Sequence, residues 1–402
     1  MPERVILTLN SGSSSLKFAL FTASLHPKRL WSGAIDRIGL SGGHFQLSDA
    51  RSTIVVNELG RLDTHEAALS RLLKAIASLP GSLDLVAVGH RVVHGGPECD
   101  CPKDVTPALL ERLRRLAYLA PLHMPPNLAG IDAVQAARPN LPQVACFDTS
   151  FHHDLPDLAR MTALPRAYAR DGIRRYGFHG LSYEYIMETL YQDSVDLDAE
   201  RIIVAHLGNG ASMAAIRDGV PIETSMGFST LAGLPMGTRT GDLDPGILLF
   251  LMQEKGMSPD EIATLLYEQS GLLGMSGLSR NMQDLLDSHE EVAAETVEYF
   301  CYQARLHLAR LTGALGGLDR IVFTGGIGEN SAQIRSRICA GLDYLGINID
   351  SAANWAGSTK ISKPDSWVIV EARATDEEQM IARHVAAKVL AKPVPQASKM
   401  RA

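Results

Sequence analysis

Two hairpin patterns, about half the chain apart, constrain the fold of this sequence more than any other feature. In the first, the apolar stretches 4–9 and 16–21 flank a run of small and polar residues that reads NSGSSS. The second reads IIVAHLGNGASMAAIRDG over residues 202–219, again a strand, a small-residue turn and a strand, with Gly210 in the place of Gly12. Such patterns are typical of hairpins. The repeat predicts two similar domains with polar hairpin tips, and a chance likeness of two short hairpins is the alternative.

The polar tips suit a phosphate group. Tracts of Ser and Gly are often flexible linkers, but the strands on either side of residues 10–15 favour an anion-binding turn, with Lys17 beside it. A third strand, residues 320–324, runs into the glycine-rich turn GGIGEN and then into a helical pattern. Backbone N–H groups at such a turn and at a helix N-terminus bind phosphate. Three turns of this kind in one chain predict a cleft that binds a nucleotide.

Helix and strand signals alternate along the chain. Helices are expected after a capping box at Asp63 and Glu66, after Thr106-Pro107, from Ser258-Pro259 to near Gly271, and over residues 291–315. Strands are expected over residues 83–90, 143–148, 201–207, 320–324 and 367–372. The alternation indicates an α/β fold, and a length of 402 residues suits two domains.

Composition excludes several classes of protein. The formal net charge is −7 and no basic cluster is present, so we expect no nucleic-acid partner. The N-terminus lacks the long apolar region of a signal peptide, and the run ILLFLM at residues 247–252 is far too short to cross a membrane. Five scattered cysteines, including Cys99 and Cys101, lack metal-ligand spacing and are interpreted as buried or unreactive thiols. The reducing cytoplasm is the expected compartment.

Four basic or imidazole residues occur in Gly- or Pro-rich motifs: Arg91, His123, His179 and Arg239. Each alone would be a surface arginine or a hydrogen-bonded loop histidine. Together they are typical of donors directed at one anionic centre. Asp148 follows a strand, and Glu377 and Glu378 lie near the C-terminus. These acids are either helix caps or, beside phosphate turns, ligands for Mg2+.

Read in order, the motifs resemble the acetate kinase family. They run from residue 9 to residue 380 and read LNSGSSSLKF, GHRVVHGG, PLHMPPN, FDTSFH, RYGFHG, HLGNGAS, TSMGF, GLPMGTRTGDLDP, GLLGMSG, FTGGIGEN and ATDEEQM. The resemblance implies two similar actin-like ATPase domains, of the duplicated ribonuclease H-like fold, flanking a nucleotide cleft. Residues 1–147 plus about 379–402 would form the N-terminal domain, and residues 148–378 the C-terminal nucleotide-binding domain. It also implies a cytoplasmic homodimer.

The activity implied is Mg2+-dependent, reversible and direct in-line transfer of a phosphoryl group from ATP to acetate, which gives acetyl phosphate and ADP. A carboxylate with a pKa near about 4.3 is already ionised at neutral pH, so this nucleophile needs no general base. The site must instead bring two anions together. We therefore expect catalysis by positioning and charge stabilisation, from Arg, His, Mg2+ and backbone donors.

The resemblance also assigns roles to single residues. Arg91 would bind the acceptor carboxylate or the transferring phosphoryl group. An apolar pocket formed by Val93, Leu122 and Phe178 would take the methyl group of the acceptor. The transition state would be stabilised by His179 and Arg239 with the help of His123, while Asp148 positions the metal or its waters. Mg2+ would be held by Asn10 and Glu377. The nucleotide would contact a larger set of residues: Ser13, Ser15, Lys17, His206, Leu207, Gly208, Asn209, Gly210, Asn281, Met282, Gln283, Gly326, Ile327, Gly328, Glu329 and Asn330.

Several positions depart from the family pattern. Met124 stands where Asn is common, and Thr230 replaces Pro at the wall of the acyl pocket. Asn281 and Gln283 replace the Asp and Arg expected near the ribose and adenine, and Asp376 replaces an Asn beside Glu377. Thr230 leaves the acyl chain open, and Asn281 and Gln283 leave the nucleotide preference open.

Three other functions compete with the acetate kinase interpretation. A propionate or butyrate kinase would use the same mechanism. A sugar kinase of the same superfamily would need a carboxylate base such as Asp148, because an alcohol does not ionise at neutral pH. A non-catalytic nucleotide-binding switch would not need Arg91, His179, Arg239 and Glu377 together. The last residues, 391–402, are expected to be frayed.

Overall fold

The computed structural model describes residues 2–193, 197 and 199–390, so the expectation for the C-terminal tail lies outside the described residues. These residues form two compact units. Unit 1 contains residues 2–150 and 376–390, and unit 2 contains the described part of Phe151–Thr375. No helix in the described part of the chain has the length and apolar character needed to span a bilayer.

Unit 1 is built on a sheet of eight strands in the order β5-β4-β3-β2-β1-β6-β8-β7. Strands β1 to β5 form an antiparallel meander, β6 and β8 add parallel to β1, and β7 closes the edge antiparallel to β8. The strands are β1 (Glu3–Ser11), β2 (Ser15–Thr22), β3 (Arg29–Asp36), β4 (His44–Asp49), β5 (Ile54–Leu59), β6 (Leu83–Val92), β7 (Lys103–Asp104) and β8 (Gln143–Phe147).

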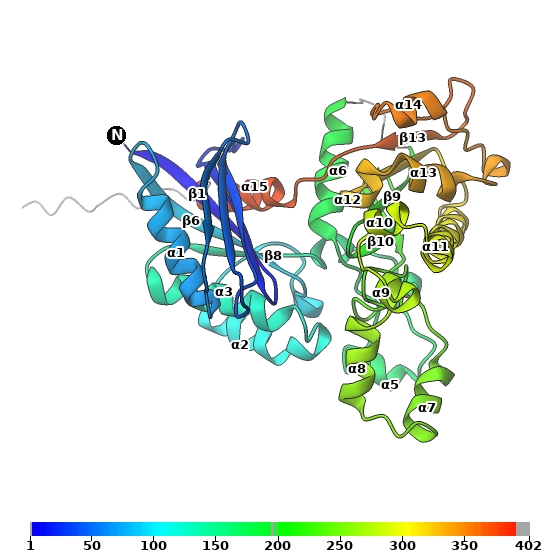
Figure 1. The fold of residues 1–402 in the computed structure, drawn as a ribbon, viewed down its shortest axis with the longest axis horizontal. Coiled ribbons are helices and arrows are strands. Elements are labelled where there is room, and N and C mark those ends of the chain that lie inside the picture. The colour runs from blue at the N-terminus through cyan, green and yellow to red at the C-terminus, as the bar shows by residue number, and fades with distance from the viewer. Residues whose placement is uncertain (1, 194–196, 198, 391–402) are drawn as a thin grey trace, which may run out of the picture. The chain divides into compact units, whose positions relative to one another are not determined.

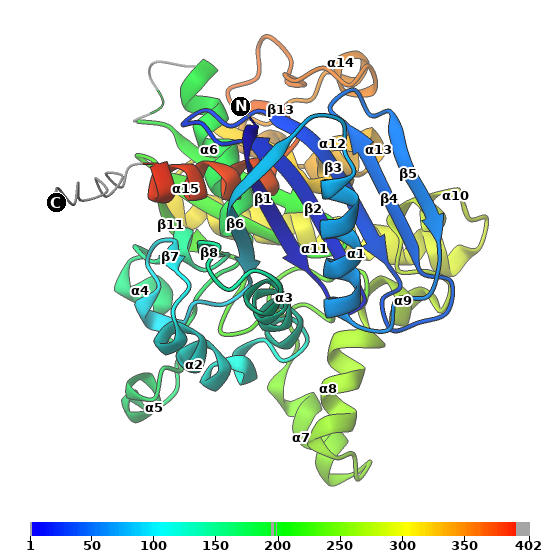
Figure 2. The same ribbon diagram turned by 90° about the vertical axis from the view of Figure 1, so that its left-hand side faces the viewer.

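Helices cover both faces of this sheet. On one face, α1 (His65–Ala77) and α3 (Met124–Ala137) pack over a core that includes Leu7, Leu9 and Phe18. On the other, α15 (Glu377–Leu390) places Ala382 against the alternate residues of β2, since neighbouring side chains of a strand point to opposite faces. Figure 2 shows α1 and α3 before the sheet and the red helix α15 behind it. The C-terminal helix therefore completes unit 1.

Shorter elements link these parts of unit 1. They are η1 (Gly96–Glu98), α2 (Pro107–Arg115), η2 (Ala117–Leu119) and η3 (Ser150–His152), the last of which leads into unit 2.

Unit 2 repeats the central pairing of unit 1 in a sheet of five strands, β11-β10-β9-β12-β13. Strands β9, β10 and β11 form an antiparallel meander, and β12 and β13 add parallel beside β9. The strands β3-β2-β1-β6-β8 of unit 1 have the same order and directions, so the predicted duplication is confirmed. The strands of unit 2 are β9 (Arg201–Leu207), β10 (Ala211–Arg217), β11 (Val220–Thr224), β12 (Arg320–Thr324) and β13 (Ile369–Ala372).

Two long helices pack against the sheet of unit 2. Helix α6 (Gly180–Asp193) buries Tyr183, Ile186 and Leu190 against β9 and β10, and α11 (Glu291–Leu315) packs against β9, β10 and β11. Figure 1 shows the chain by residue number and labels these elements. The other helices of unit 2 are α4 (Asp157–Arg160), α5 (Arg166–Arg170), α7 (Pro245–Gln253), α8 (Pro259–Glu268), α9 (Gly271–Ser276), α10 (Met282–Asp287), α12 (Gly325–Asn330), α13 (Ala332–Cys339), η4 (Asp343–Leu345) and α14 (Ser351–Trp355).

One local prediction is wrong. Helix α1 has no capping box at Asp63 and Glu66; its N-cap is Thr64, whose hydroxyl accepts from the Ala67 N–H at 3.1 Å, while Asp63 pairs with Arg61. Arg91 is the penultimate residue of β6, beside the Gly-containing segment that follows this strand. The helix predicted to begin at Ser258-Pro259 is α8, in which Ser258 and Glu261 form a capping box and which ends at Glu268.

The two hairpin tips also align differently from the sequence repeat. The β1–β2 tip is Gly12 to Ser14, and the β9–β10 tip is Gly208 to Gly210. Gly12 therefore begins its tip, whereas Gly210 ends its own. The equivalent of Gly12 is Gly208, because strand ends rather than glycines determine where the tip begins.

Candidate functional site

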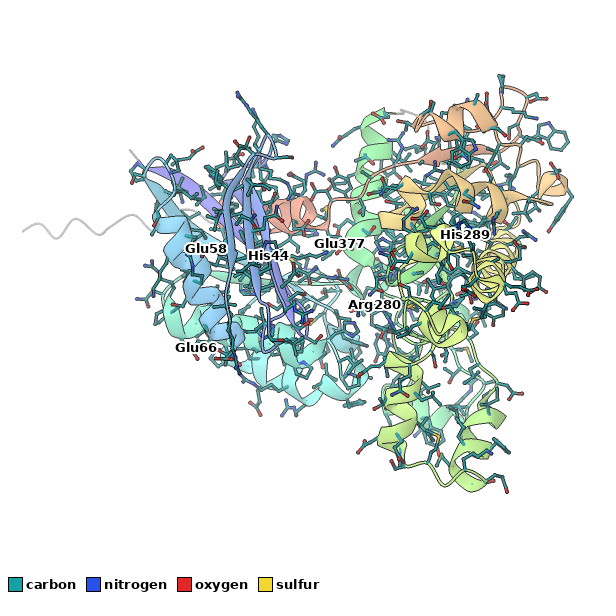
Figure 3. All side chains as sticks on the ribbon, viewed as in Figure 1. His44, Glu58, Glu66, Arg280, His289 and Glu377 are labelled. Atoms are coloured by element: carbon teal, nitrogen blue, oxygen red, sulfur yellow. The ribbon has the colours of Figure 1, made fainter. Side chains whose placement is uncertain are left out.

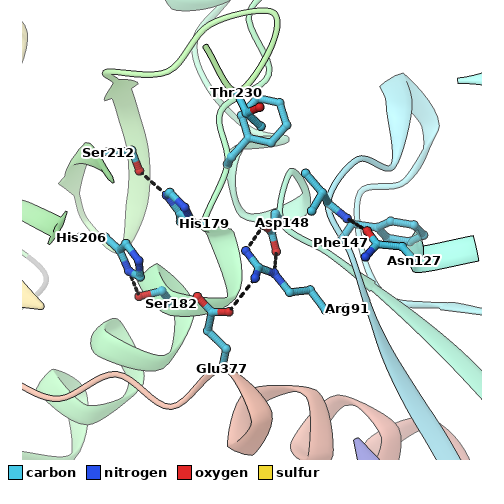
Figure 4. A network of polar contacts seen from close by, with 12 residues as sticks. Arg91, Asn127, Phe147, Asp148, His179, Ser182, His206, Ser212, Thr230 and Glu377 are labelled. Carbon is cyan, nitrogen blue, oxygen red and sulfur yellow. Dashed lines mark hydrogen bonds and ion pairs between the residues drawn. The ribbon is translucent and has the colours of Figure 1, made fainter. Parts of the chain in front are cut away.

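The described residues of unit 1 include a charged cluster where β6 and β8 end and α15 begins (Figure 4). Arg91 donates from Nε and Nη2 to the two carboxylate oxygens of Asp148, at 2.9 and 2.6 Å. Its Nη1 lies 3.4 Å from a carboxylate oxygen of Glu377. The Asp148 side chain is only 2% exposed. Parallel pairing of β6 with β8 brings Arg91 and Asp148 together, since Arg91 lies opposite Cys146 in the register.

Burial and charge oppose one another at Arg91. Burial lowers the pKa of Arg91, but the nearby carboxylates of Asp148, Glu377 and Glu378 outweigh it and raise that pKa. The guanidinium is therefore permanently charged, and its fork suits a carboxylate or a phosphoryl group. The three-residue cluster has two acidic side chains, Asp148 and Glu377, to one guanidinium, and this composition favours a cation beside it.

The first turn of α15 is strongly acidic. Asp376 accepts from the Gln379 N–H at 2.9 Å and from Arg29 Nη2 at 2.5 Å, so it caps the helix. Burial raises the pKa of Glu378, an effect that Arg29 opposes and that Glu377 and Asp376 reinforce. The helix N-terminus stabilises negative charge on the acidic side chains of this first turn.

Asn127 of α3 joins the ends of two strands of unit 1. Its side-chain N–H donates to the Ser11 carbonyl at 2.7 Å, and its side-chain oxygen accepts from the Val93 N–H at 3.0 Å. At Gly130, one turn on, a Cβ atom would lie 2.3 Å from Ser11 Oγ, so α3 approaches β1 at its glycine. The polar tip after β1 and the segment after β6 are thus held by one buried amide.

The other predicted residues of unit 1 have varied surroundings. Asn10 lies opposite Lys17 in the β1–β2 pairing, at the base of the tip that holds Ser13, and Ser15 is the first residue of β2. His123 is the N-cap residue of α3. Val93 is buried, whereas Leu122 is 37% exposed. These facts place Asn10, Lys17, Arg91, His123 and Glu377, with Asp148, in unit 1.

His179 begins α6 in unit 2 with a left-handed backbone, φ 58°. Its carbonyl accepts the N–H groups of Ser182 and Tyr183, at 3.0 and 3.2 Å, and its Nδ1 lies 2.8 Å from Ser212 Oγ. The ring stacks on His206 with centroids 4.4 Å apart. The His206 Nδ1 in turn contacts the hydroxyl of Ser182 at 2.8 Å (Figure 4). The imidazole orientation is therefore determined by three features: the start of α6, the contact with Ser212 on β10 and the stacking on His206.

Arg239 lies beside the same imidazole. Its Nη1 donates to the Thr230 carbonyl at 2.8 Å. A Cβ atom on Gly210 would lie 3.0 Å from both Arg239 Nη2 and His179 Nε2. The two cationic or polar groups therefore share the space over Gly210, which explains a residue without a side chain there. Thr230 is buried, and its hydroxyl has no hydrogen-bond partner among the described residues.

A cavity of about 350 Å³ lies elsewhere in unit 2, between the β9–β10 tip, α10 and α12. Predicted nucleotide residues line it: Gly208, Asn209, Asn281, Met282, Gln283, Gly326, Ile327 and Asn330. The predicted residues His206, Leu207, Gly210, Gly328 and Glu329 do not line it. Arg280 (Figure 3), Leu286 and Ser331 do, and sequence reasoning missed them. Apolar Met282, Leu286 and Ile327 with several amides suit a base and ribose.

Two of the substituted residues in this cavity have local partners. The Asn281 side chain accepts from the Gln283 N–H at 2.9 Å and so caps α10. Gln283 donates from its side chain to Asp287 at 2.9 Å. Capping of α10 is thus a sufficient structural reason for an asparagine at position 281, without any contact to a ligand.

The glycine-rich turn of α12 is held from behind by the buried Arg335. Its Nη1 donates to the carbonyls of Gly328 and Glu329, both at 2.9 Å, and its Nε donates to the Asn354 side chain at 2.7 Å. An arginine in a helical pattern is normally interpreted as a surface residue. No sequence signal indicates that this one is buried, because its partner Asn354 lies in a separate helix.

Comparison with known proteins gives consistent results. The model of the Acetokinase family matches residues 5–383. An acetate kinase of Rhodopseudomonas palustris is 48% identical over 393 residues, which cover 95% of this chain and 97% of that protein. An acetate kinase of Methylocella silvestris is 47% identical over 395 residues, 96% of this chain and 98% of that protein.

Solved structures agree in fold. The crystal structure of Porphyromonas gingivalis acetate kinase matches with a TM-score of 0.86 and 36% identity, covering 96% of this chain and 100% of that one. A propionate kinase from Francisella tularensis matches with a TM-score of 0.88 and 35% identity, covering 96% and 99%.

Proposed function

This chain belongs to the acetokinase family, and we propose that it transfers the γ-phosphoryl group of ATP to acetate, with Mg2+, through the charged cluster of unit 1 and the donors of unit 2. It is a phosphotransferase with a carboxyl group as acceptor. In the forward step an acetate oxygen forms a bond to the γ-phosphorus. The bond from that phosphorus to the bridging oxygen breaks, and its electron pair leaves with ADP.

The observation that carries the choice of acceptor is the Arg91–Asp148 pair. Both oxygens of the buried Asp148 carboxylate accept hydrogen bonds from Arg91. A carboxylate held in this way is a poor general base, which a hydroxyl acceptor would need. A carboxylate acceptor needs only a cation and hydrogen-bond donors, and Arg91 supplies both. The pair therefore favours an acyl kinase over a sugar kinase.

We assign the transferring phosphoryl group to His179 and Arg239, with His123 assisting. Their roles would be to donate to the oxygens on which charge accumulates, the kind of contribution that costs about 10²–10³ in rate when one donor is lost. The cavity at Asn209, Asn281 and Ile327 would take the nucleoside. Its phosphates would contact Ser13 of the β1–β2 tip, Ser15 and Lys17 of β2, and the α12 turn from Gly326 to Asn330. His206, Leu207 and Gly210 would support the β9–β10 tip.

Magnesium fits the donors of unit 1 chemically. Mg2+ prefers one or two protein oxygens together with phosphate and water. Glu377 offers a carboxylate in a cluster of two acidic side chains and one guanidinium, and Asn10 offers an amide oxygen at the base of the polar tip. Among the described residues no cluster of three or more His, Cys, Asp or Glu side chains could hold a metal by itself. The ion would thus arrive with the nucleotide and neutralise phosphate charge.

Acetate is the proposed acyl substrate, with propionate as the second candidate. Val93 of unit 1 and Phe178 of unit 2 are both buried, and Leu122 of unit 1 is 37% exposed. An apolar acyl pocket distinguishes substrates that differ by one methylene group by only about 1–3 kcal/mol. Propionate is the second candidate because one similar structure, with a TM-score of 0.88, is a propionate kinase. Turnover measured with both acids distinguishes the two substrates.

We further propose a cytoplasmic homodimer. Helix α7 exposes Ile247, Leu249 and Phe250, and α11 exposes Tyr302 and Leu306. Exposed apolar surface of this kind supports an interface between copies. All five cysteines are free thiols, which suits a reducing compartment. Sedimentation of the full chain at micromolar concentration tests the dimer, with Phe250→Asp expected to shift it to monomer.

The decisive test of the activity is acyl phosphate formation from Mg-ATP, trapped as a hydroxamate. Acetate, propionate, butyrate and a hexose are compared in parallel. We expect turnover to be greatest with acetate and to fall as the chain lengthens. A maximum at propionate would change the substrate but keep the mechanism. Phosphorylation of the hexose alone would refute the role given to Arg91 and Asp148.

A further inference from the structure

Behind the imidazole of His179, two buried hydroxyl groups form a hydrogen-bonded chain. Tyr183 lies one turn further along α6, and Ser212 lies on β10. Ser212 Oγ is 2.8 Å from His179 Nδ1, as Figure 4 shows, and the Tyr183 hydroxyl contacts the same Oγ atom. Tyr183 and Ser212 are both completely buried. One end of this hydrogen-bonded chain is therefore the Tyr183 hydroxyl in the protein interior, and the other end is the His179 imidazole.

The burial of Tyr183 determines which hydroxyl group donates and which accepts in this chain of hydrogen bonds. Burial raises the pKa of Tyr183, so the phenol keeps its proton at neutral pH. Among the described residues, Ser212 is the hydrogen-bond partner of that hydroxyl. A buried donor without an acceptor is destabilising, so Tyr183 donates to Ser212 Oγ. The Ser212 hydroxyl then donates its own proton to His179 Nδ1.

A neutral imidazole nitrogen that accepts a hydrogen bond carries no proton, and the other ring nitrogen carries it. We propose that Tyr183 and Ser212 are positioning residues that hold His179 as the neutral tautomer with its proton on Nε2. That nitrogen faces the space over Gly210, next to Arg239 Nη2. An Nε2–H group and a guanidinium thus act as two donors side by side. Which group receives them depends on the proposed function, but the tautomer does not.

Arg239 also opposes a second proton on His179, because its guanidinium places a positive charge beside Nε2. On the far side of Tyr183, burial lowers the pKa of His152 to about 4, so that ring is neutral as well. A second proton on His179, at Nδ1, would force the Ser212 hydroxyl to turn and would leave the Tyr183 proton without an acceptor.

Tyr183 also has a purely structural role to be separated from this one. Its ring packs against Phe151 and His152 in the core of unit 2. A loss of stability on mutation would follow from either role. A measurement at the His179 ring, and the comparison of kcat with KM, distinguish the two.

The first experiment is neutron diffraction on crystals of the full deuterium-exchanged chain. We expect deuterium on Nε2 and none on Nδ1 of His179, and deuterium on the Ser212 hydroxyl directed at Nδ1. Deuterium on Nδ1 would overturn the proposal. The result does not depend on activity, so it stands apart from the test of acyl phosphate formation.

The second experiment uses Tyr183→Phe, which keeps the ring and removes the hydroxyl. We expect Nδ1 of His179 to gain partial protonation and kcat to fall about three- to tenfold, the range of one intramolecular hydrogen bond, with KM for ATP unchanged. Tyr176→Phe is the matched control, because its hydroxyl donates to the Gly172 carbonyl at 2.9 Å and not to this chain. An unaltered tautomer and kcat in Tyr183→Phe would overturn the proposal.

Ser212→Ala provides an independent check if Tyr183→Phe folds poorly. It removes the donor to Nδ1 directly, so its loss of kcat should equal or exceed that of Tyr183→Phe. Because both residues act through His179, the double variant should be no slower than Ser212→Ala alone. Multiplicative losses in the double variant would show that the two hydroxyls act separately, against the proposal.

Discussion

The two units share a five-strand arrangement, yet they carry opposite kinds of polar chemistry at their strand ends. In unit 1 the end of β6 and the residue after β8 hold formal charges, Arg91 and Asp148, joined by Glu377. In unit 2, His179 before α6 meets the hydroxyl of Ser212 at the start of β10, and a cavity beside the β9–β10 tip is lined by apolar and amide side chains. The repeated frame positions residues, and the chemistry of each unit comes from the side chains at the strand ends.

This difference predicts that mutations in the two units have different effects on stability and turnover. A buried ion network tolerates the loss of one member poorly, because an uncompensated charge remains in the interior. A neutral hydrogen-bonded site loses orientation instead, with a smaller effect on stability. Mutations in unit 1 should therefore reduce both stability and turnover, whereas mutations around His179 should mainly reduce turnover.

The largest effect is expected for Arg91→Ala. It removes the guanidinium that contacts both the buried Asp148 and the partly buried Glu377, so we expect a loss of about 3–5 kcal/mol in the free energy of unfolding and a fall in kcat of about 10³. Urea unfolding and the hydroxamate assay measure the two. The control is Arg114→Ala, whose ion pair with Asp132 is about half exposed and should change stability by less than about 1 kcal/mol. Equal stability losses in the two variants would contradict the contrast.

Arg239→Ala should slow turnover by about 10²–10³ and leave nucleotide binding nearly intact. Arg239 contacts Thr230 and the space over Gly210, and it does not line the cavity given to the nucleoside. Calorimetric titration with ADP, beside the hydroxamate assay, separates the two effects. Arg337→Ala, which removes a loose surface pair with Glu298 at 3.9 Å, should change neither. Parallel losses of affinity and turnover would make Arg239 a binding residue.

A smaller effect distinguishes the two hairpin tips. An alanine at Gly210 would place Cβ 3.0 Å from both His179 Nε2 and Arg239 Nη2, so it should displace them and lower kcat about tenfold. An alanine at Gly12 would meet Ser15 Oγ at 2.8 Å, a hydroxyl that can rotate away. We expect Gly12→Ala to cost less. A larger loss of turnover at Gly12 would reverse the assignment of catalytic donors to unit 2.

Sequence patterns predicted the elements better than their partners. Both hairpins, the α11 helix and the strand–turn–helix at residues 320–339 follow local spacing, and the structure contains them. The Gly12 and Gly210 alignment was wrong because a shared glycine does not determine a turn register. Roles that depend on distant partners were also missed. Asn127 bonds to Ser11 across 116 residues, and Ser212 to His179 across 33, and no local pattern encodes such contacts.

The last comparison concerns stability in acid, because each unit contains a buried histidine with a lowered pKa. Burial lowers the pKa of His90, in unit 1, to about 4, and that of His152, in unit 2, to about 4. The unfolded chain takes up these protons near pH 6.5, so the stability is complete above that pH and is lost as the pH falls from 6.5 through 4. His90→Gln removes one of these titrating groups, so the dependence of unfolding free energy on pH should weaken by about one proton in this range. Urea unfolding of both proteins at intervals from pH 7 to 4 measures it. An unchanged slope would mean that His90 is protonated in the folded chain, because its 2.7 Å contact with the Gln143 side-chain oxygen, which favours the protonated ring, outweighs burial.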